Sequence, residues 1–345
     1  MKKNLVKKMM SVVLTAGMLA GMCAVPVAAE APEFEEQTIT VSYNAAETTP
    51  HGQGVSKFKE LVEEKTGGKV TVDCYFNGTL YNTQTEFEAL QKGEVDLIMG
   101  SLNSAMEYIP ELKTTFCPFL WKSIDHYNGF WTSEDGQALL TKIQDELDVH
   151  YFTFASAGSR NIELTKDKKI TCREDMADIK LRSAAAENML AMVEALGANP
   201  VPIAFGDTYL GLQTGLAEGL EGDTQGLYAQ GFNEVLKSIT LTGHAFSFDG
   251  FIASQKIWDT WSPELQAVIE ESIDETNAYI NGITADAEAA AADKLAADGI
   301  TIYELTDEEL SAYREEVMEY FINSDYAQDY DMELFEKMKA MGDQF

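Results

Sequence analysis

The amino-acid sequence predicts an α/β fold with two lobes, each a mainly parallel sheet flanked by helices, and a long C-terminal helix that bridges both lobes. Strand and helix patterns alternate along two blocks, at 37–157 and 158–245, and residues 263–299 then keep helical spacing over a length that can brace both. Such a β-α-β succession produces parallel sheets. Once a leader is removed, about 315 residues remain, which is enough for two domains of about 100–200 residues each.

The first block consists of short elements separated by turn residues. Strands are indicated by β-branched runs or by strict alternation, as at Val70, Val72 and Cys74, and helices by apolar residues three or four apart, as at Val55 and Phe58. In chain order, the predicted elements are a strand at 38–43, a helix at 51–65, a strand at 69–76, a helix at 83–92, a strand at 95–99 and, after a less regular stretch, a strand at 149–155.

The second block repeats this pattern with shorter strands. Gly197 and Gly215 follow the apolar helical spacing and end two of its helices, because glycine readily takes the left-handed conformation that closes a helix. The predicted elements are a strand at 179–182, a helix at 185–196, a strand at 199–203, a helix at 207–214, a strand at 220–222 and a helix at 224–236.

The last third begins with a clear helix start. Ser262 is an N-cap residue, proline occupies the first helical position, and an acid follows near the positive end of the helix dipole. Apolar residues then recur at helical spacing as far as Gly299, interrupted only by Gly282. Residues 300–305 predict a strand, and Thr306 with the glutamate three positions later forms a capping box that opens another helix.

The expected domain organisation follows from the two blocks and the long helix. No internal repeat or low-complexity linker separates the lobes, so we expect several short crossings between them, as in a hinged protein. The expected segments are a signal peptide at 1–29, a disordered segment at 30–36, lobe I at 37–157 plus about 246–287, and lobe II at 158–245 plus about 288–345.

The N-terminus has the architecture of a secretory signal peptide. Four lysines precede an apolar stretch at 12–25 that is too short to span a bilayer, and small residues then precede Glu30. The alternatives are a membrane anchor and a lipoprotein cut before Cys23, although Met22 is not the small residue that such a cut needs. We therefore expect cleavage after Ala29 and a mature protein that works outside the cytoplasm.

Charge and cysteine content narrow the classes of partner. The formal net charge of −32 becomes −36 once the four leader lysines are removed, and this acidity argues against nucleic acid and anionic membrane as partners. An acidic protein that binds an acid must gather its few cations at the site. Three cysteines remain, an odd number without a CxxC motif, and we expect small buried hydrophobic residues, with one disulfide left open: Cys74, Cys117 and Cys172.

Signatures of catalysis and of cofactor or metal binding are absent from the sequence. It contains no GxSxG, HExxH, phosphate loop or GxGxxG after a strand, and its four histidines have no metal-ligand spacing. We therefore expect no enzyme activity and no cofactor. His51 follows the first predicted strand, where it lies near a site at the strand end or, alternatively, serves only at the helix start.

Arginine is scarce, and its positions are informative. Arg182 stands at the carboxyl end of a predicted strand, just before a helix. Ligands bind at that edge of open α/β sheets, helix N-termini favour anions, and arginine holds a carboxylate with a planar fork that lysine lacks. Arg160 follows another strand near the domain crossing, and the alternative for both is surface salt bridging. Arg173 and Arg314, in polar or helical stretches, are expected to be structural.

Three segments of the chain resemble the solute-binding subunits of tripartite ATP-independent periplasmic (TRAP) transporters, of the dicarboxylate-binding (DctP) type. The similarity extends from about Thr38 to the C-terminal helices. The matching segments are Gly78-Thr79-Leu80 with Gln91 to Asp96, Ala157 to Arg160 with Glu174 to Arg182, and Pro200 to Pro202 with Tyr209 to Gly215 and Glu218 to Glu221; Cys117 to Leu120 also matches the family's PFL.

The resemblance implies a two-lobed, periplasmic-binding-protein-like fold that closes over an organic acid and delivers it to a pair of TRAP membrane permease subunits. The family's carboxylate-clamping arginine falls on Arg182 and its second ligand-side arginine on Arg160. The family's ligand-donating asparagine falls on Gly222, so the sequence departs there, and Gly100-Ser101 lacks an acid that some members have. The implied substrate-binding residues are Arg182, Arg160, Phe205, Tyr209, Glu221, Asp223, Gln225 and His51.

Several alternatives remain open at this point. Asp223 or Gln225 can replace the missing asparagine, and C4-dicarboxylates and sugar acids such as hexuronates fit the predicted site comparably well. The protein is expected to be a monomer. A solute-binding protein for a different transporter or a sensor, or an extracytoplasmic enzyme on a similar scaffold, are the other functions considered.

Overall fold

The structure, a computed structural model, describes residues 33–106 and 108–345. The predicted signal peptide, the Cys23 alternative and the first residues of the predicted disordered segment lie outside the described residues. Residues 33–36 form neither helix nor strand.

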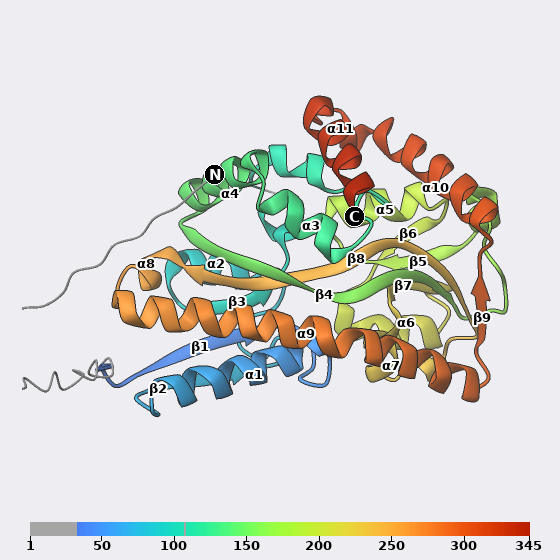
Figure 1. The fold of residues 1–345 in the computed structure, drawn as a ribbon. Coiled ribbons are helices and arrows are strands. Elements are labelled where there is room, and N and C mark those ends of the chain that lie inside the picture. The colour runs from blue at the N-terminus through green and yellow to red at the C-terminus, as the bar shows by residue number, and fades with distance from the viewer. Residues whose placement is uncertain (1–32, 107) are drawn as a thin grey trace, which may run out of the picture. The chain divides into compact units, whose positions relative to one another are not determined.

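The described residues form a mixed sheet of nine strands in the order β2-β1-β3-β8-β4-β7-β5-β6, with β9 paired to β8 (Figure 1). The pairs β1–β2, β1–β3, β5–β6, β5–β7 and β8–β9 are parallel, and the pairs around β4 and β8 are antiparallel. The strands are β1 Gln37–Tyr43, β2 Val70–Tyr75, β3 Leu97–Gly100, β4 Val149–Leu164, β5 Lys180–Ser183, β6 Asn199–Pro202, β7 Gly219–Asp223, β8 Ser238–Ser254 and β9 Thr301–Glu304.

Helices cover both faces of this sheet, which confirms the predicted α/β class. In Figure 1, α1, α6, α7 and α9 lie on one face, and α3, α4, α5, α10 and α11 on the other. Separate hydrophobic clusters fill the two faces. The helices are α1 Pro50–Lys65, α2 Glu86–Lys92, α3 Ile124–Trp131, α4 Glu134–Leu147, α5 Glu187–Ala195, α6 Thr208–Gln213, α7 Thr224–Ala229, α8 Gln255–Trp258, α9 Pro263–Ala297, α10 Asp307–Ile322 and α11 Met332–Met341.

The helix α9 runs for 35 residues along one face and begins as predicted, with the Ser262 hydroxyl accepting from the Leu265 amide. Its middle is tied to the centre of β4, where Asn281 accepts from the Ser156 amide at 3.0 Å and Thr284 donates to the Ser156 carbonyl at 3.0 Å. Gly158 follows in β4 with φ of 104°, and a Cβ there would stand 2.2 Å from a Glu288 oxygen. Only glycine fits this conformation and this close approach.

Two long strands connect the two ends of the sheet. Sequence patterns predicted only the first half of β4 and did not predict β8, which pairs with β4 through several register shifts. Those irregularities, with Gly243 and Gly250 inside β8, break the alternation by which a strand is recognised. The expected lobe boundaries fall inside β4, β8 and α9, and they stay a prediction.

Two further differences concern helices. The predicted helix at 224–236 ends at Ala229, because Gly231 takes a left-handed conformation with φ of 77° and a short 3-10 turn follows. The helices α3 and α4 and the last helix, α11, were not predicted from the sequence. The helix α11 packs on residues assigned to lobe I, where His126 Nε2 lies 2.8 Å from the Met338 carbonyl oxygen.

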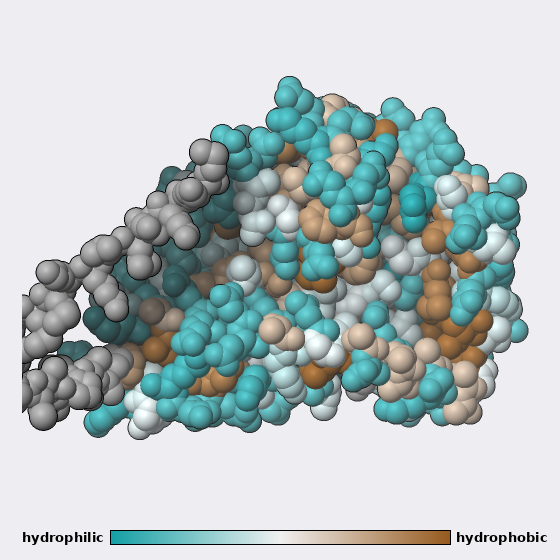
Figure 2. Space-filling view, in the orientation of Figure 1, coloured by the Kyte–Doolittle hydropathy of each residue, from teal (hydrophilic) through white to brown (hydrophobic). Residues whose placement is uncertain are grey.

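The exposed surface of the helices is predominantly hydrophilic on the face drawn in Figure 2. This agrees with the strongly acidic composition.

The capping box predicted at Thr306 is present, with reciprocal hydrogen bonds to Glu309. Within residues 33–106 and 108–345, no helix has both the length and the apolar character needed to cross a membrane.

Candidate ligand-binding site

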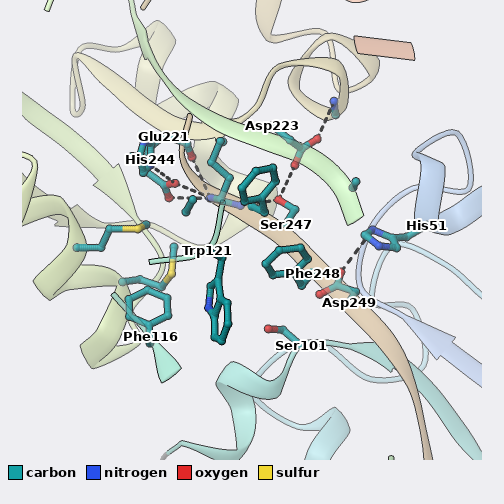
Figure 3. A pocket seen from close by; sticks show the side chains of 18 of the residues that line it. His51, Ser101, Phe116, Trp121, Glu221, Asp223, His244, Ser247, Phe248 and Asp249 are labelled. Atoms are coloured by element: carbon teal, nitrogen blue, oxygen red, sulfur yellow. Dashed lines mark hydrogen bonds and ion pairs between the residues drawn. The ribbon is translucent and has the colours of Figure 1, made fainter. Parts of the chain in front are cut away.

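A cavity of about 290 Å³ lies where β1, β3, β5 and β7 reach their carboxyl ends. Tyr43 ends β1, Ser101 follows β3, and Arg182 and Asp223 stand near the ends of β5 and β7. This is the edge at which open α/β sheets bind ligands. The cavity is completed by residues within 101–106 and 115–121 and by β8 (Figure 3).

Arg160, on β4, is held by a carboxylate of the protein itself. Its Nε and Nη2 donate to the two carboxylate oxygens of Glu221 at 2.6 and 2.7 Å, and its Nη1 donates to Ser247 at 3.0 Å. Burial opposes the charge of both groups, yet their attraction prevails, so the pKa of Arg160 is raised and that of Glu221 is lowered. His244 Nε2 lies 3.4 Å from the same carboxylate, which adds to this lowering.

Arg182, on β5, is buried but has no such partner. Its side chain is only 7% exposed, and its Nε donates to the Ile203 carbonyl at 3.0 Å. No carboxylate of the described residues makes an ion pair with it. Burial lowers the pKa of Arg182 to about 10, because the neighbouring Glu221 charge, already shared with Arg160, compensates only in part. A buried cation without a counter-ion is costly, so this position favours an anionic ligand.

Asp223 and Gln225 are engaged within the protein. Asp223 accepts from the Ser247 hydroxyl at 3.1 Å and from the Gly226 amide at 2.9 Å, and so caps α7. Gln225 donates to the Ala157 carbonyl and to Asp223. Asp223 lines the cavity, whereas Gln225 is not among the lining residues.

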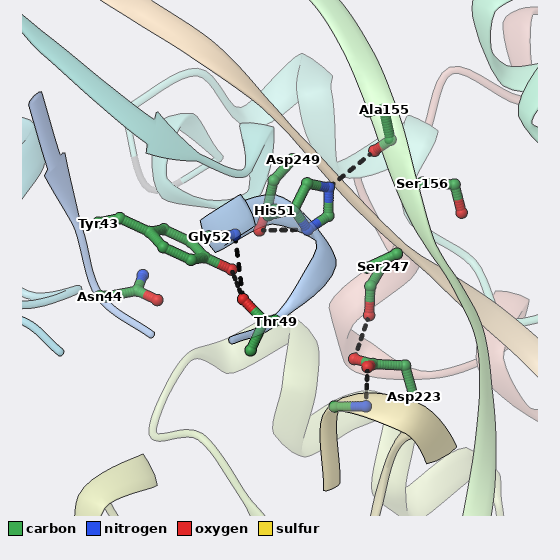
Figure 4. Close-up of polar contacts among 12 residues, drawn as sticks. Tyr43, Asn44, Thr49, His51, Gly52, Ala155, Ser156, Asp223, Ser247 and Asp249 are labelled. Carbon is green, nitrogen blue, oxygen red and sulfur yellow. Dashed lines mark hydrogen bonds and ion pairs between the residues drawn. The ribbon is translucent and has the colours of Figure 1, made fainter. Parts of the chain in front are cut away.

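His51 stands at the start of α1 and lines the cavity, and Figure 4 shows its ring between Ala155 and Asp249. Its Nε2 lies 3.2 Å from the Ala155 carbonyl oxygen, which can only accept, so this nitrogen carries the hydrogen. Its Nδ1 then faces Asp249 at 3.7 Å. The Asp249 carboxylate is 25% exposed and borders the cavity. The neighbouring Glu86 is buried, and burial followed by the Asp249 charge raises its pKa to about 8.

The structure therefore brings most of the predicted site residues together. Six of them line the cavity: Arg182, Arg160, Phe205, Glu221, Asp223 and His51. Tyr209 does not, because its hydroxyl turns away and donates to Glu234 at 2.6 Å. Gly222 lines the cavity without a side chain.

Sequence reasoning missed the aromatic side of the cavity and the acid on β8. These residues come from the segment at 110–121, which has no regular periodicity, and from the unrecognised β8; they are Phe116, Trp121, Phe246, Ser247, Phe248 and Asp249. The one sequence signal for them was the PFL-like motif at 117–120, which borders Trp121.

Three cysteines of the described residues, Cys74, Cys117 and Cys172, are free thiols, and Cys117 lines the cavity. Burial raises the pKa of the Cys117 thiol, which makes it unreactive. Within the described part of the chain, no cluster of histidine, cysteine or acidic side chains is arranged to hold a metal ion.

The family model of a bacterial extracellular solute-binding protein, family 7 (DctP), matches residues 41–327. The chain belongs to this family. It is 30% identical over 302 residues to the C4-dicarboxylate-binding periplasmic protein DctP of Rhodobacter capsulatus, covering 87% of this chain and 90% of the relative.

Solved structures of TRAP periplasmic solute-binding proteins agree with this assignment. A TRAP periplasmic solute-binding protein of Roseobacter denitrificans, with bound 3-deoxy-D-manno-oct-2-ulosonic acid, superposes with a TM-score of 0.83 at 25% identity, covering 89% of this chain and 100% of that chain. One from Shewanella oneidensis, with bound succinate, has a TM-score of 0.81 at 27% identity, covering 89% and 99%. The predicted two-lobed fold and the TRAP resemblance are confirmed, and these relatives are named as solute-binding proteins.

Proposed function

We propose that this DctP-family protein captures a small organic acid outside the cytoplasm and delivers it to a TRAP-type membrane permease. The observation that carries the proposal is Arg182, a buried guanidinium at the ligand-binding edge of the sheet without a carboxylate partner among the described residues. A ligand carboxylate would supply that partner through two parallel charge-assisted hydrogen bonds. Relatives with bound succinate and with a bound sugar acid support an organic acid as the ligand class.

Arg182→Ala tests this proposal directly. Removing one partner of a buried ion pair costs about 3–5 kcal/mol, so binding should weaken roughly 10²–10⁴-fold. Arg182→Lys keeps the charge but loses the fork, and it should also bind worse than wild type. Calorimetric titration, with an acid identified by thermal-shift screening, measures these differences.

Arg314→Ala is the matched control, because Arg314 is exposed and does not line the cavity. Circular dichroism must show that each variant is folded. Binding by Arg182→Ala within about threefold of wild type would contradict the carboxylate clamp.

Arg160 needs a different variant, because it already holds Glu221. Arg160→Ala would leave a buried carboxylate unpaired and unfold or distort the site, whatever its part in binding. The double variant Arg160→Met with Glu221→Gln removes both charges together. If Arg160 also contacts the ligand, this double variant stays folded and loses affinity.

The proposed location rests on the leader sequence and on the family. We propose cleavage after Ala29, a freely secreted monomer, and closure of the two lobes over the ligand. Mass spectrometry of the exported protein should give Glu30 as its first residue. A lipid-modified Cys23 at the terminus would overturn this.

A further inference from the structure

We infer that the ligand is a monocarboxylate with an aromatic or otherwise apolar body and a hydrogen-bond donor at its far end. This inference rests on the proposed function and narrows it to a substrate class. It follows from three properties of the cavity: the number of cations without partners, the state of its polar groups, and the nature of its walls.

The first property is that, among the described lining residues, one arginine has no ion-pair partner. Arg160 is occupied by Glu221 and Ser247, which leaves Arg182. The described lining contains no lysine, and it contains three carboxylates: Glu221, Asp223 and Asp249. A dicarboxylate bound at Arg182 would therefore place its second charge in a cavity where further carboxylates repel it, and like charges brought together out of water are strongly unfavourable.

The second property is that most polar groups of the wall already have partners. Trp121 Nε1 donates to the Thr115 carbonyl at 3.0 Å, and the Thr49 hydroxyl donates to the Ala46 carbonyl at 2.8 Å. His244 lies between Thr242 and Glu221, and Ser247 lies between Arg160 and Asp223. A polyhydroxylated acid would lose water from hydroxyl groups that find few partners here, which weakens its binding.

The third property is an aromatic and thioether wall. Phe248 stacks on Tyr127 with ring centroids 3.9 Å apart and on Phe246 at 5.4 Å, and Trp121 packs edge-on against Tyr127 at 5.0 Å. The side chains of Met106, Met189 and Met192 add flexible apolar surface to the cavity wall. An apolar cavity of about 150 Å³ already holds benzene. The cavity of about 290 Å³ therefore has room for one ring together with a carboxylate and a short linker.

The far end of the cavity presents an acceptor. In the view of Figure 3, Trp121 and Phe248 lie between the Glu221–His244 pair and the Asp249–His51 pair. The Arg182 guanidinium belongs to the first end, since Glu221 and Arg160 are the charges that act on it. Asp249 is partly exposed at the other end, and its carboxylate can only accept. A ligand hydroxyl or N–H group at that end would be recognised by Asp249.

Calorimetric titration of the secreted protein with four probes tests this inference: 3-(4-hydroxyphenyl)propanoate, 3-phenylpropanoate, succinate and galacturonate. The hydroxylated aromatic acid should bind at least about tenfold more tightly than succinate or galacturonate, and more tightly than its analogue without the hydroxyl. Tighter binding of succinate or galacturonate than of both aromatic acids would overturn the inference.

Two variants sharpen the test. In Asp249→Asn, the advantage of the hydroxylated probe over its analogue should shrink severalfold, and succinate should bind better than to wild type because a like charge is gone. Trp121→Leu should weaken both aromatic acids by about tenfold and leave succinate unchanged. An Asp249→Asn variant that treats all four probes as wild type does would overturn the role assigned to Asp249.

The same probes separate this inference from the proposed function. If succinate or galacturonate binds most tightly and Arg182→Ala abolishes that binding, the carboxylate clamp stands and the apolar-body inference is wrong. If the aromatic acids bind and Arg182→Ala binds them equally well, the clamp is wrong. If none of a wider panel of organic acids binds, both are wrong.

Discussion

Arg160 and Arg182 border the same cavity and carry the same side chain, but they have different partners in the fold. Glu221 holds Arg160 through both carboxylate oxygens, so this guanidinium fixes β4 to β7 before any ligand arrives. Arg182 is buried beside this pair, with the Ile203 carbonyl and the Phe205 ring as neighbours and no carboxylate of the described residues in an ion pair with it. A ligand carboxylate gains more at Arg182, because there it replaces a missing counter-ion and does not compete with Glu221.

Glu86 gives a prediction of pH-dependent stability. It is 1% exposed, Asn44 donates to one of its oxygens at 3.4 Å, and no described residue hydrogen-bonds to the other. Burial, then Asp249, raises its pKa to about 8. The folded protein therefore keeps a proton that the unfolded chain has lost, so this contribution to stability is complete below about pH 4 and is lost as the pH rises through 8.

The variant Glu86→Gln stays uncharged at every pH. Its melting temperature should exceed that of wild type at pH 8.5 and approach it at pH 5, which calorimetric scans can measure. Glu88→Gln is the control, because Glu88 is exposed and paired with Lys92. The same melting-temperature difference from wild type at both pH values would show that Glu86 does not lose a proton in the fold between pH 5 and 8.5.

Among single residues, the site residue that could be predicted best from the sequence was of a rare type. Four arginines in so acidic a chain made Arg182 stand out, and its place at a strand end gave the reason. Nothing in the sequence distinguished Asp249 from the other acidic residues, because acids are common along the chain and the strand that carries Asp249 was not predicted. The partner that occupies Arg160 could not be foreseen either, since it depends on how β4 pairs with β7.

Among the elements, the short parallel strands and the long helix α9 were predictable because each has a clean local pattern and a capping or glycine signal. The long strands β4 and β8 were not, because their bulges and glycines interrupt the pattern and their stability comes from pairing with each other. The sequence at 110–121 has no regular periodicity, so the aromatic residues that it contributes to the cavity wall could not be predicted.

The helix α9 gives a prediction at the scale of one element. Gly282 is exposed in its middle, and a Cβ there would meet nothing within 4 Å. Gly282→Ala should stabilise the protein by about 0.4–1 kcal/mol, because alanine loses less backbone freedom on folding. Gly54→Ala in α1 is the contrasting variant, since its Cβ would stand 2.4 Å from Ile280 of α9. Urea denaturation should show the two changes with opposite signs, and a destabilising Gly282→Ala would contradict the expectation.

For the molecule as a whole, we predict that ligand binding compacts the protein. β4, β8 and α9 cross the expected lobe boundaries, and three continuous crossings permit a hinge motion that keeps the two halves in register. Only a closed state lets Arg182 on one side and Asp249 on the other reach one ligand. Small-angle scattering should show the radius of gyration falling as the identified acid is added. Unchanged scattering at saturation would speak against hinge closure.

The unpaired guanidinium of Arg182 also bears on how long each copy of the protein survives. When the cavity is empty, the desolvated Arg182 cation destabilises the folded state, and a bound acid removes this cost. At a ligand concentration 100 times Kd, binding raises the free energy of unfolding by about 2.7 kcal/mol. Proteases that attack transiently opened chains would then cut the loaded protein about a hundredfold more slowly. Turnover of the protein would then follow the supply of its ligand, so the protein would be degraded faster where that ligand is scarce. A protease half-life that is the same with and without the acid would exclude this.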